Sequence, residues 1–326
     1  MPFSFLKPRN DSTPQPEDAG AKGASALRGM GLEEQLKKLR PKPRSEGLRA
    51  ASGAGQGLAR AAHSALLTTK LRPVVDALVK LIPKANQERA REHLPIILRQ
   101  CIETGLTDPR QVAYVVATAD HESKFGQARY SRSKPLVEDR NPISRRDGRY
   151  TGTVHTHGGS ITAPNADAAE TAYWDSAYGG MLGNRKGTTD GRRYRGRGYV
   201  QLTGRSNYAS MTEKLTAEGF TYECDGKTWG TAENPIDLTK HPTHVNRVPE
   251  LAARILAMGS RDGSFTGVGL DDYINEDGAD YRNARRVING TDQAASIADL
   301  AKRYETPLVK LWPSVAARDG GAAGPE

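Results

Sequence analysis

The stretch TDPRQVAYVVATADHESKF, residues 107–125, predicts a helix around which the fold is built. Asp108 is a good capping residue, Pro109 suits the first helical position, and Gln111 is placed to complete a capping box. Four apolar residues then recur at helical spacing and share one face, namely Val112, Val115, Val116 and Ala119. We therefore expect this face to be buried in a helical core.

Glu122 follows Ala119 by three residues, so it lies at the edge of that apolar face, near the C-terminal end of the helix. Desolvation and the negative end of the helix dipole both favour a protonated carboxyl at such a position. A protonated carboxyl is what a general acid requires. Many helices also end on a solvated glutamate, so the pattern alone leaves both interpretations open.

Helical patterns flank this segment on both sides. They occupy residues 72–84, 86–105, 207–218, 246–259 and 293–304. Residues 127–168 instead hold many Gly, Pro, Arg and Asn and show little apolar periodicity, which predicts a long surface loop or lobe with only short strands. The predicted fold class is mainly α with minor β.

The positive charge is concentrated near the N-terminus. The chain of 326 residues has a net charge of +9, and residues 1–72 hold 13 Lys and Arg against 6 Asp and Glu, a surplus of 7. Residues 1–60 are also rich in Gly, Pro, Ser and Ala, which predicts a disordered basic arm, either a possible targeting segment for anionic partners or a solvated tail. A single domain over residues 70–312 and a flexible tail over residues 313–326 are expected after it.

No secretory signal and no membrane-spanning segment are expected. Residues 1–10, MPFSFLKPRN, lack the apolar stretch of a secretory signal, and no apolar run approaches the roughly 18 residues of a membrane-spanning helix. The sequence thus predicts synthesis in the cytoplasm without a signal peptide.

The two cysteines, Cys101 and Cys224, fit neither a disulfide framework nor a zinc-binding spacing. Cys101 lies in an apolar helical pattern and is expected to be a small core residue, although a single disulfide stays open. His155 and His157 alternate, but no further ligand completes an obvious set, so neither a metal nor a cofactor is expected.

A second informative segment is RRYRGRGYVQLTGRSNY, residues 192–208. Gln201 and Thr203 are two residues apart, so an extended backbone would present both polar side chains on one face. Amide and hydroxyl groups beside tyrosine rings suit a sugar, which has hydroxyl edges and apolar faces. No GxGxxG follows Gly196 and Gly198, and the arginines lack a recognised nucleic-acid-binding fold, so neither dinucleotide nor nucleic-acid binding is expected.

Residues 119–123, ADHES, together with this arginine-rich segment, resemble the family 19 glycoside hydrolases, which include chitinases and phage endolysins. Residues 184–185 and the segment RRVING at residues 285–290 agree with this resemblance, which covers roughly residues 70–312. It implies a lysozyme-like domain with two lobes and a central cleft. It also implies an inverting mechanism that uses two carboxylates.

The resemblance also implies roles for individual residues. By position, Glu122 matches the proton donor of the family. Substrate binding is implied for residues of the arginine-rich and late segments, namely Arg197, Tyr199, Gln201, Thr203, Asn207, Asn289 and either Arg285 or Arg286. Trp174 and Tyr178 lie one helical turn apart and fit sugar stacking and core packing equally well.

The second carboxylate is assigned less directly. In an inverting enzyme it lies about 6.5 to 9.5 Å from the acid, which leaves room for a water molecule. Residues 136–138, LVE, resemble the segment that carries the second glutamate in endolysin members, so Glu138 is the predicted base. A long loop makes Glu170 the alternative, and Glu138 also fits a plain surface charge.

These observations predict a peptidoglycan hydrolase that cleaves β-1,4 glycosidic bonds. A chitinase, a lytic transglycosylase and a non-catalytic wall-binding or particle protein on the same fold are the alternatives. The expected partners are glycan strands of peptidoglycan or chitin, and a phage tail or contractile injection particle through residues 1–60. Delivery to the cell wall would then depend on a holin or on that particle.

Overall fold

The computed structural model describes the backbone of residues 67–126, 143–146, 149–156 and 159–316. The predicted central helix is present as α4, Pro109–Ser123. The Asp108 carboxylate accepts a hydrogen bond from the backbone N–H of Arg110 at 2.8 Å, as expected of a cap. Beyond α4 the described chain is mainly helical, and its strands form only small antiparallel sheets, as predicted.

The helices other than α4 are a helix over residues 67–79, α3 (Lys84–Glu103), α5 (Ala166–Tyr178), α6 (Asp190–Arg193), α7 (Arg205–Ala217), α8 (His244–Arg247), α9 (Pro249–Arg261) and α10 (Ala294–Ala316). Two short 3₁₀ helices are η1 (Leu270–Asp272) and η2 (Asn283–Val287). The strands are β1 (Ile143–Arg146), β2 (Arg149–Thr156), β3 (Gly159–Thr162), β4 (Tyr222–Cys224), β5 (Lys227–Trp229), β6 (Ile274–Asn275) and β7 (Gly278–Ala279).

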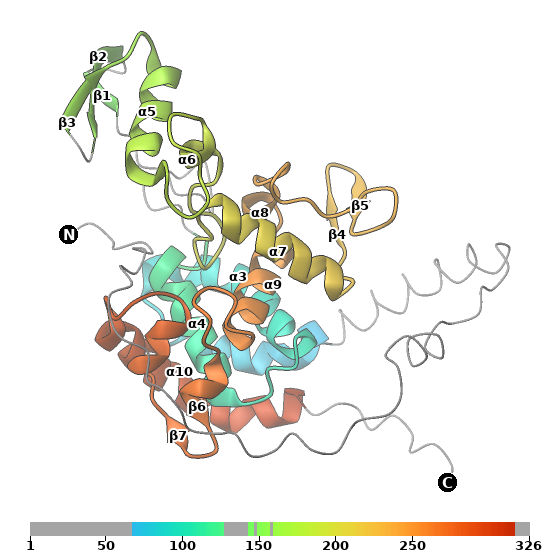
Figure 1. Cartoon of the computed structure of the whole chain (residues 1–326). Helices are drawn as coiled ribbons and strands as arrows, with labels where there is room; N and C mark the ends of the chain where they lie inside the picture. Colours follow the sequence, from blue (N-terminus) through green and yellow to red (C-terminus); the bar gives the residue numbers. More distant parts are fainter. Residues whose placement is uncertain (1–66, 127–142, 147–148, 157–158, 317–326) are drawn as a thin grey trace, which may run out of the picture. The chain divides into compact units, whose positions relative to one another are not determined.

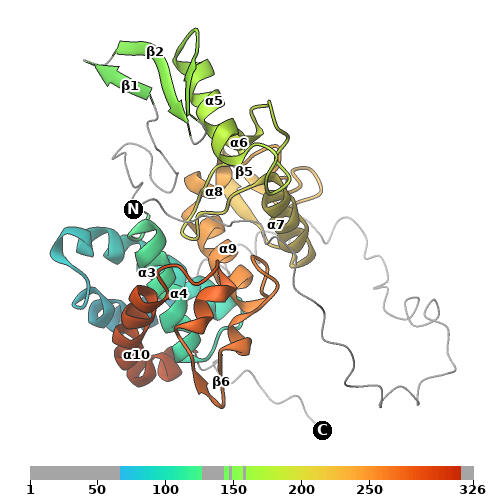
Figure 2. The ribbon, with the colours of Figure 1, turned by 60° about the vertical axis from the view of Figure 1, so that its left-hand side comes forward.

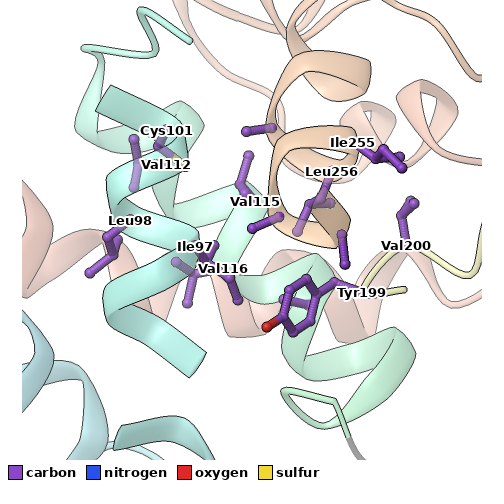
Figure 3. Packing of buried hydrophobic residues seen from close by; sticks show 14 of the residues in the cluster. Ile97, Leu98, Cys101, Val112, Val115, Val116, Tyr199, Val200, Ile255 and Leu256 are labelled. Carbon is purple, nitrogen blue, oxygen red and sulfur yellow. The ribbon is translucent and has the colours of Figure 1, made fainter. Parts of the chain in front are cut away.

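Helix α4 is buried on every side rather than on one face. The four predicted core residues are fully buried, but so are Ala113, Tyr114 and Ala117 on the other faces. Helices α3, α9 and α10 surround α4 (Figure 1). Side chains from α3, α4 and α9 interdigitate in one cluster, which includes Ile97, Val115 and Leu256 (Figure 3). The small residues of α4 permit the neighbouring helices to approach it closely, and α4 is the central, fully surrounded helix of the core.

Two polar side chains of α4 join it to distant segments. Gln111 does not complete a capping box, and this prediction is wrong. Its amide instead donates to the Asp271 carboxylate at 2.5 Å and to the Ile274 carbonyl at 2.8 Å. The buried Asp120 carboxylate accepts a hydrogen bond from the Tyr304 hydroxyl of α10 at 2.8 Å. Because Gln111 and Asp120 are buried and lie near opposite ends of α4, these bonds hold both ends of the helix in place.

Short strands occupy part of the predicted long loop, and helix α5 begins at its end, where the sequence pattern predicted no helix. β1, β2 and β3 form an antiparallel sheet, and α5 packs beside it (Figure 2). Tyr173, Trp174 and Tyr178 of α5 form the buried part of a second, smaller apolar cluster. Trp174 and Tyr178 stack with ring centroids 5.7 Å apart, so these two aromatics serve core packing.

The two cysteines are free and buried, and Cys101 lies in the main core as predicted. Among the residues that the structure describes, no helix combines the length and the apolar character needed to cross a bilayer.

Candidate functional site

Glu122 forms a buried ion pair with Arg285. The Glu122 Oε1 atom lies 2.7 Å from Nη1 of Arg285, and the two side chains are 6 % and 2 % exposed. Charged side chains are almost never this buried unless they are paired, and buried pairs frequently mark functional sites. The sequence around Glu122 predicts desolvation of its carboxyl, but no nearby residue indicates the cation that offsets this desolvation.

Arg285 is held by its own short helix. It lies in η2, and its Nε–H donates to the Asp292 carbonyl at 3.0 Å. One edge of the guanidinium is therefore fixed by backbone while another faces Glu122, which keeps the planar group in one orientation. Arg286, the next residue, is exposed, and its carbonyl accepts a hydrogen bond from the Thr266 hydroxyl at 2.6 Å. Of the two adjacent arginines, Arg285 is the one that the structure brings to Glu122.

The chain leaves α4 in a strained conformation directly after Glu122. Lys124 and Phe125 both have positive φ angles, 47° and 57°, although neither is glycine. Their backbone N–H groups donate to the carbonyls of Asp120 and Ala119. Non-glycine residues in this region cost roughly 1 to 3 kcal/mol each and concentrate at functional sites. The backbone after Glu122 is thus held by hydrogen bonds in a conformation that is energetically unfavourable for non-glycine residues.

Tyr114 adds a third polar group near the pair. Its ring is buried and stacks on that of Tyr281, with centroids 6.3 Å apart. Burial raises the pKa of the Tyr114 hydroxyl, and the charges of Arg285 and Glu122 both act on it. Among the described residues this hydroxyl has no hydrogen-bond partner. Tyr114 is not recognisable as a site residue from the sequence, because its position inside an apolar helix indicates only core packing.

The arginine-rich segment folds into a tight hairpin, not an extended strand. Arg197 and Leu202 exchange backbone hydrogen bonds, and the four residues between them form the turn. Gln201 has a φ of +56°, so it and Thr203 do not share a face of an extended chain, and that prediction is wrong. The glycine at 198, with a φ of +76°, supplies the left-handed conformation that starts the turn.

The polar side chains of this hairpin hydrogen-bond mainly to their own loop. Gln201 donates to the Gly198 carbonyl at 2.8 Å. Thr203 donates to the Gln201 carbonyl at 2.8 Å, and Asn207 donates to the Thr203 carbonyl at 2.7 Å. Gln201 and Asn207 are half-buried, whereas Thr203 is buried. Their observed partners lie in the loop rather than at Glu122.

Arg197 and Tyr199 are built into the core. Arg197 donates to the Tyr208 hydroxyl at 2.9 Å and to the Arg193 carbonyl at 2.7 Å. Tyr199 is fully buried, and its hydroxyl lies 2.6 Å from Nδ1 of His93 on α3. Both residues therefore connect the hairpin to the core. The sequence alone does not distinguish this structural contribution from sugar binding.

Replacing Tyr199 with phenylalanine is expected to lower the free energy of unfolding. The change removes the partner of a buried histidine nitrogen on α3, which costs about 1 to 3 kcal/mol. Urea denaturation followed by circular dichroism measures the effect. An unchanged free energy of unfolding would show that the Tyr199 hydroxyl does not stabilise the core.

Two other predicted site residues lie in separate surroundings. Asn289 is half-buried after η2, where its amide oxygen accepts the Gly290 N–H at 2.8 Å. Glu170 of α5 is 26 % exposed and pairs with Arg192 at 2.9 Å and with Arg195 at 4.0 Å. Glu138 lies outside the described residues. Glu170 therefore already has two cationic partners in the α5–α6 region.

A surface hollow of about 510 Å³ lies away from this pair. It is lined by Ala77 and Leu81 near the N-terminal helix and by side chains of α10 that include Lys302, Arg303 and Pro307. Neither Glu122 nor the hairpin contributes to its walls. The aliphatic parts of lysine and arginine side chains form much of its rim. The hollow is therefore separate from the site around Glu122.

The geometry defines a class of site: a buried glutamate and arginine at the strained end of a central helix. Comparison with known protein families gives no match, and comparison with curated proteins gives none either.

Proposed function

We propose that this chain is a peptidoglycan hydrolase in which Glu122 is the general acid. The observation that carries the proposal is the buried Glu122–Arg285 pair at the strained end of α4. Glu122 alone of the two is able to donate a proton to a leaving sugar oxygen, because a guanidinium stays charged at any ordinary pH. Arg285 then orients the carboxyl.

Arg285 places a condition on this chemistry. Acid catalysis requires a carboxyl that faces the leaving sugar oxygen, whereas Oε1 of Glu122 contacts Nη1 of Arg285 in this structure. The proposal therefore requires the bound glycan to loosen this contact, so that the carboxyl turns toward the leaving oxygen before the bond breaks. The positive charge of Arg285 then stabilises the carboxylate that remains after proton transfer.

The rest of the mechanism follows the resemblance of the sequence to family 19 glycoside hydrolases. Glu138 would act as the base on the attacking water, with Glu170 as the alternative. Glu170 is the weaker candidate, because Arg192 and Arg195 already engage its carboxylate. A lysozyme-like cleft between two lobes belongs to the same proposal, as do substrate contacts from Gln201 and Asn207, which are half-buried.

Delivery and partners complete the proposal. The glycan strands of peptidoglycan are the substrate, and residues 1–60 would address the protein to a phage tail or contractile injection particle. The net charge of this basic region suits an anionic surface.

A non-catalytic wall-binding or particle protein is the second candidate. It is favoured by the low exposure of the Glu122 side chain, 6 %, and by its contact with Arg285, because a purely structural ion pair has the same features. The two candidates differ in whether glycan strands are cut at all.

Product analysis tests the proposal. We expect purified peptidoglycan, incubated with the protein, to yield muropeptides with ordinary reducing ends, identified by mass spectrometry. An inverting enzyme releases the α-anomer first, which NMR detects during the early reaction. Anhydro-muramyl ends would instead identify a lytic transglycosylase, faster cleavage of chitin oligomers a chitinase, and no cleavage of either polymer the non-catalytic alternative.

A further inference from the structure

A second cluster of reactive side chains lies where β4 and β5 meet α8. The two strands are joined by Asp225 and Gly226, which have φ angles of +53° and +70°. Asp-Gly is the sequence that the tight two-residue hairpin turn prefers. The turn places Cys224 and Asp225 side by side, and α8 begins at His244. Three residue types that bind metals are thereby gathered from two segments 19 positions apart.

The distances within this cluster suit a metal ion. Cys224 Sγ lies 3.8 Å from Oδ2 of Asp225, and His244 Nε2 lies 3.9 Å from the same oxygen. The three ligand atoms all lie within 4.8 Å of one another. Ligands of a tetrahedral zinc ion, with bonds of about 2.0 to 2.3 Å, are separated by about 3.3 to 3.8 Å. Side-chain adjustments of about 1 Å would therefore complete the geometry.

The histidine is already oriented for this purpose. Its Nδ1 lies 2.9 Å from the buried hydroxyl of Tyr222, and its ring packs against Trp229 and His241, with centroids 4.8 and 5.0 Å away. If Nδ1–H donates to Tyr222, the lone pair of Nε2 faces Asp225. Metal-binding histidines characteristically use one nitrogen for the ion and the other for such a hydrogen bond.

We propose that Cys224, Asp225 and His244 form a zinc-binding site. A set of one sulfur, one nitrogen and one oxygen ligand favours Zn²⁺ over Mg²⁺ and Ca²⁺, which prefer oxygen alone. Binding releases the thiol proton of Cys224 to solvent, and a water molecule takes the fourth position. Asp225 now pairs with Arg247, at 2.8 Å through Nη1, so the ion replaces that partner.

The site has a structural consequence that is independent of Glu122. A metal bound to both segments ties the β4–β5 hairpin to the start of α8. Sequence spacing did not reveal it, because only one cysteine takes part and the histidine is distant along the chain. The proposal thus stands or falls separately from glycan cleavage.

Metal titration of the full chain tests the proposal. After treatment with a chelator and its removal, the protein is titrated with Zn²⁺ against a competing chromophoric indicator. We expect one ion per chain and a rise in Tm of about 5 to 10 °C when free zinc is about 100 times Kd. In a separate sample of the metal-free protein, Co²⁺ is added as a spectroscopic probe, and a thiolate-to-cobalt charge-transfer band is expected, which Zn²⁺ then removes.

The variants Cys224→Ala and His244→Ala are expected to weaken zinc binding at least about 10-fold. Removing a residue that only hydrogen-bonds to a metal ligand already costs about this much, and these two residues would be ligands themselves. Cys101→Ala is the matched control, since Cys101 is a free buried cysteine in the main core, and it should keep both the affinity and the cobalt band. Should a variant fail to fold, the cobalt spectrum of the unaltered chain decides the question. Absence of stoichiometric zinc, a cobalt spectrum without a thiolate band, or undiminished affinity in Cys224→Ala would overturn the site.

Discussion

Replacing Glu122 with glutamine is expected to slow peptidoglycan hydrolysis by about 100- to 10,000-fold, the range that general acid catalysis contributes. The amide has nearly the same shape and keeps an oxygen that accepts the hydrogen bond from Arg285 Nη1. It has no proton to donate to the leaving sugar. The initial rate of turbidity loss in a suspension of cell walls measures the effect.

The structure also predicts a stability change for this variant. Without the carboxylate charge, the buried guanidinium of Arg285 loses its counter-ion but keeps its hydrogen bonds, so we expect a loss of about 1 to 3 kcal/mol. Assays must therefore be run at a temperature where circular dichroism shows the variant to be folded. A folded Glu122→Gln protein that lyses walls at the normal rate would remove Glu122 from the mechanism.

Glu138→Gln and Glu170→Gln locate the base in the same assay. We expect the first to abolish activity and the second to leave most of it, because Glu170 is engaged by Arg192 and Arg195. The reverse pattern would assign the base to Glu170. Full activity of both variants would show that neither predicted glutamate activates the attacking water.

Replacing Arg285 with methionine is expected to destabilise the fold by about 3 to 5 kcal/mol, the largest stability effect predicted for this chain. The change leaves the Glu122 carboxylate buried at 6 % exposure without its cation and frees the Asp292 carbonyl. Desolvation of an unpaired charge is the physical cause. Urea denaturation followed by circular dichroism measures the free energy of unfolding.

Two further variants show whether the pair is the cause. Arg286→Met changes the neighbouring exposed arginine and should alter stability by no more than about 0.5 kcal/mol. The double variant Glu122→Leu/Arg285→Met removes both charges and should recover much of the lost stability, since apolar pairs replace buried ion pairs well. If the double variant is as unstable as Arg285→Met alone, packing around the arginine, and not charge, explains the loss.

Much of the fold was predictable because its signals are local. The capping residue Asp108, the proline after it and the apolar spacing of residues 112–119 located α4, since helix caps and helical periodicity act within a few residues. The same periodicity located α3, α7 and α9 to within a few residues, but only the start of α10, which continues to Ala316, well past the predicted end at residue 304. The core position of Cys101 followed from its helical neighbours.

The candidate site was predictable only in part. Glu122 is placed by its own helix, but its partner Arg285 lies 163 residues away in sequence. Gln201 and Thr203 were predicted to lie on an extended strand, because alternating polar and apolar residues indicate a strand. The glycine at 198 instead starts a turn that reverses the chain. Arg197 and Tyr199 carry polar groups that suit a sugar, and whether such groups face a ligand or the core depends on what packs above them.

The sequence by itself determined the positions of α3, α4, α7 and α9, the carboxylate near the end of α4, and where charge accumulates along the chain. The tertiary structure alone decided that α4 is buried on all sides, that Arg285 rather than Arg286 meets Glu122, and that Cys224, Asp225 and His244 converge. The physical reason is range. Hydrogen bonds and periodicity within a helix are set by neighbours a few residues apart, whereas ion pairs and metal-ligand clusters form between segments that only packing brings together.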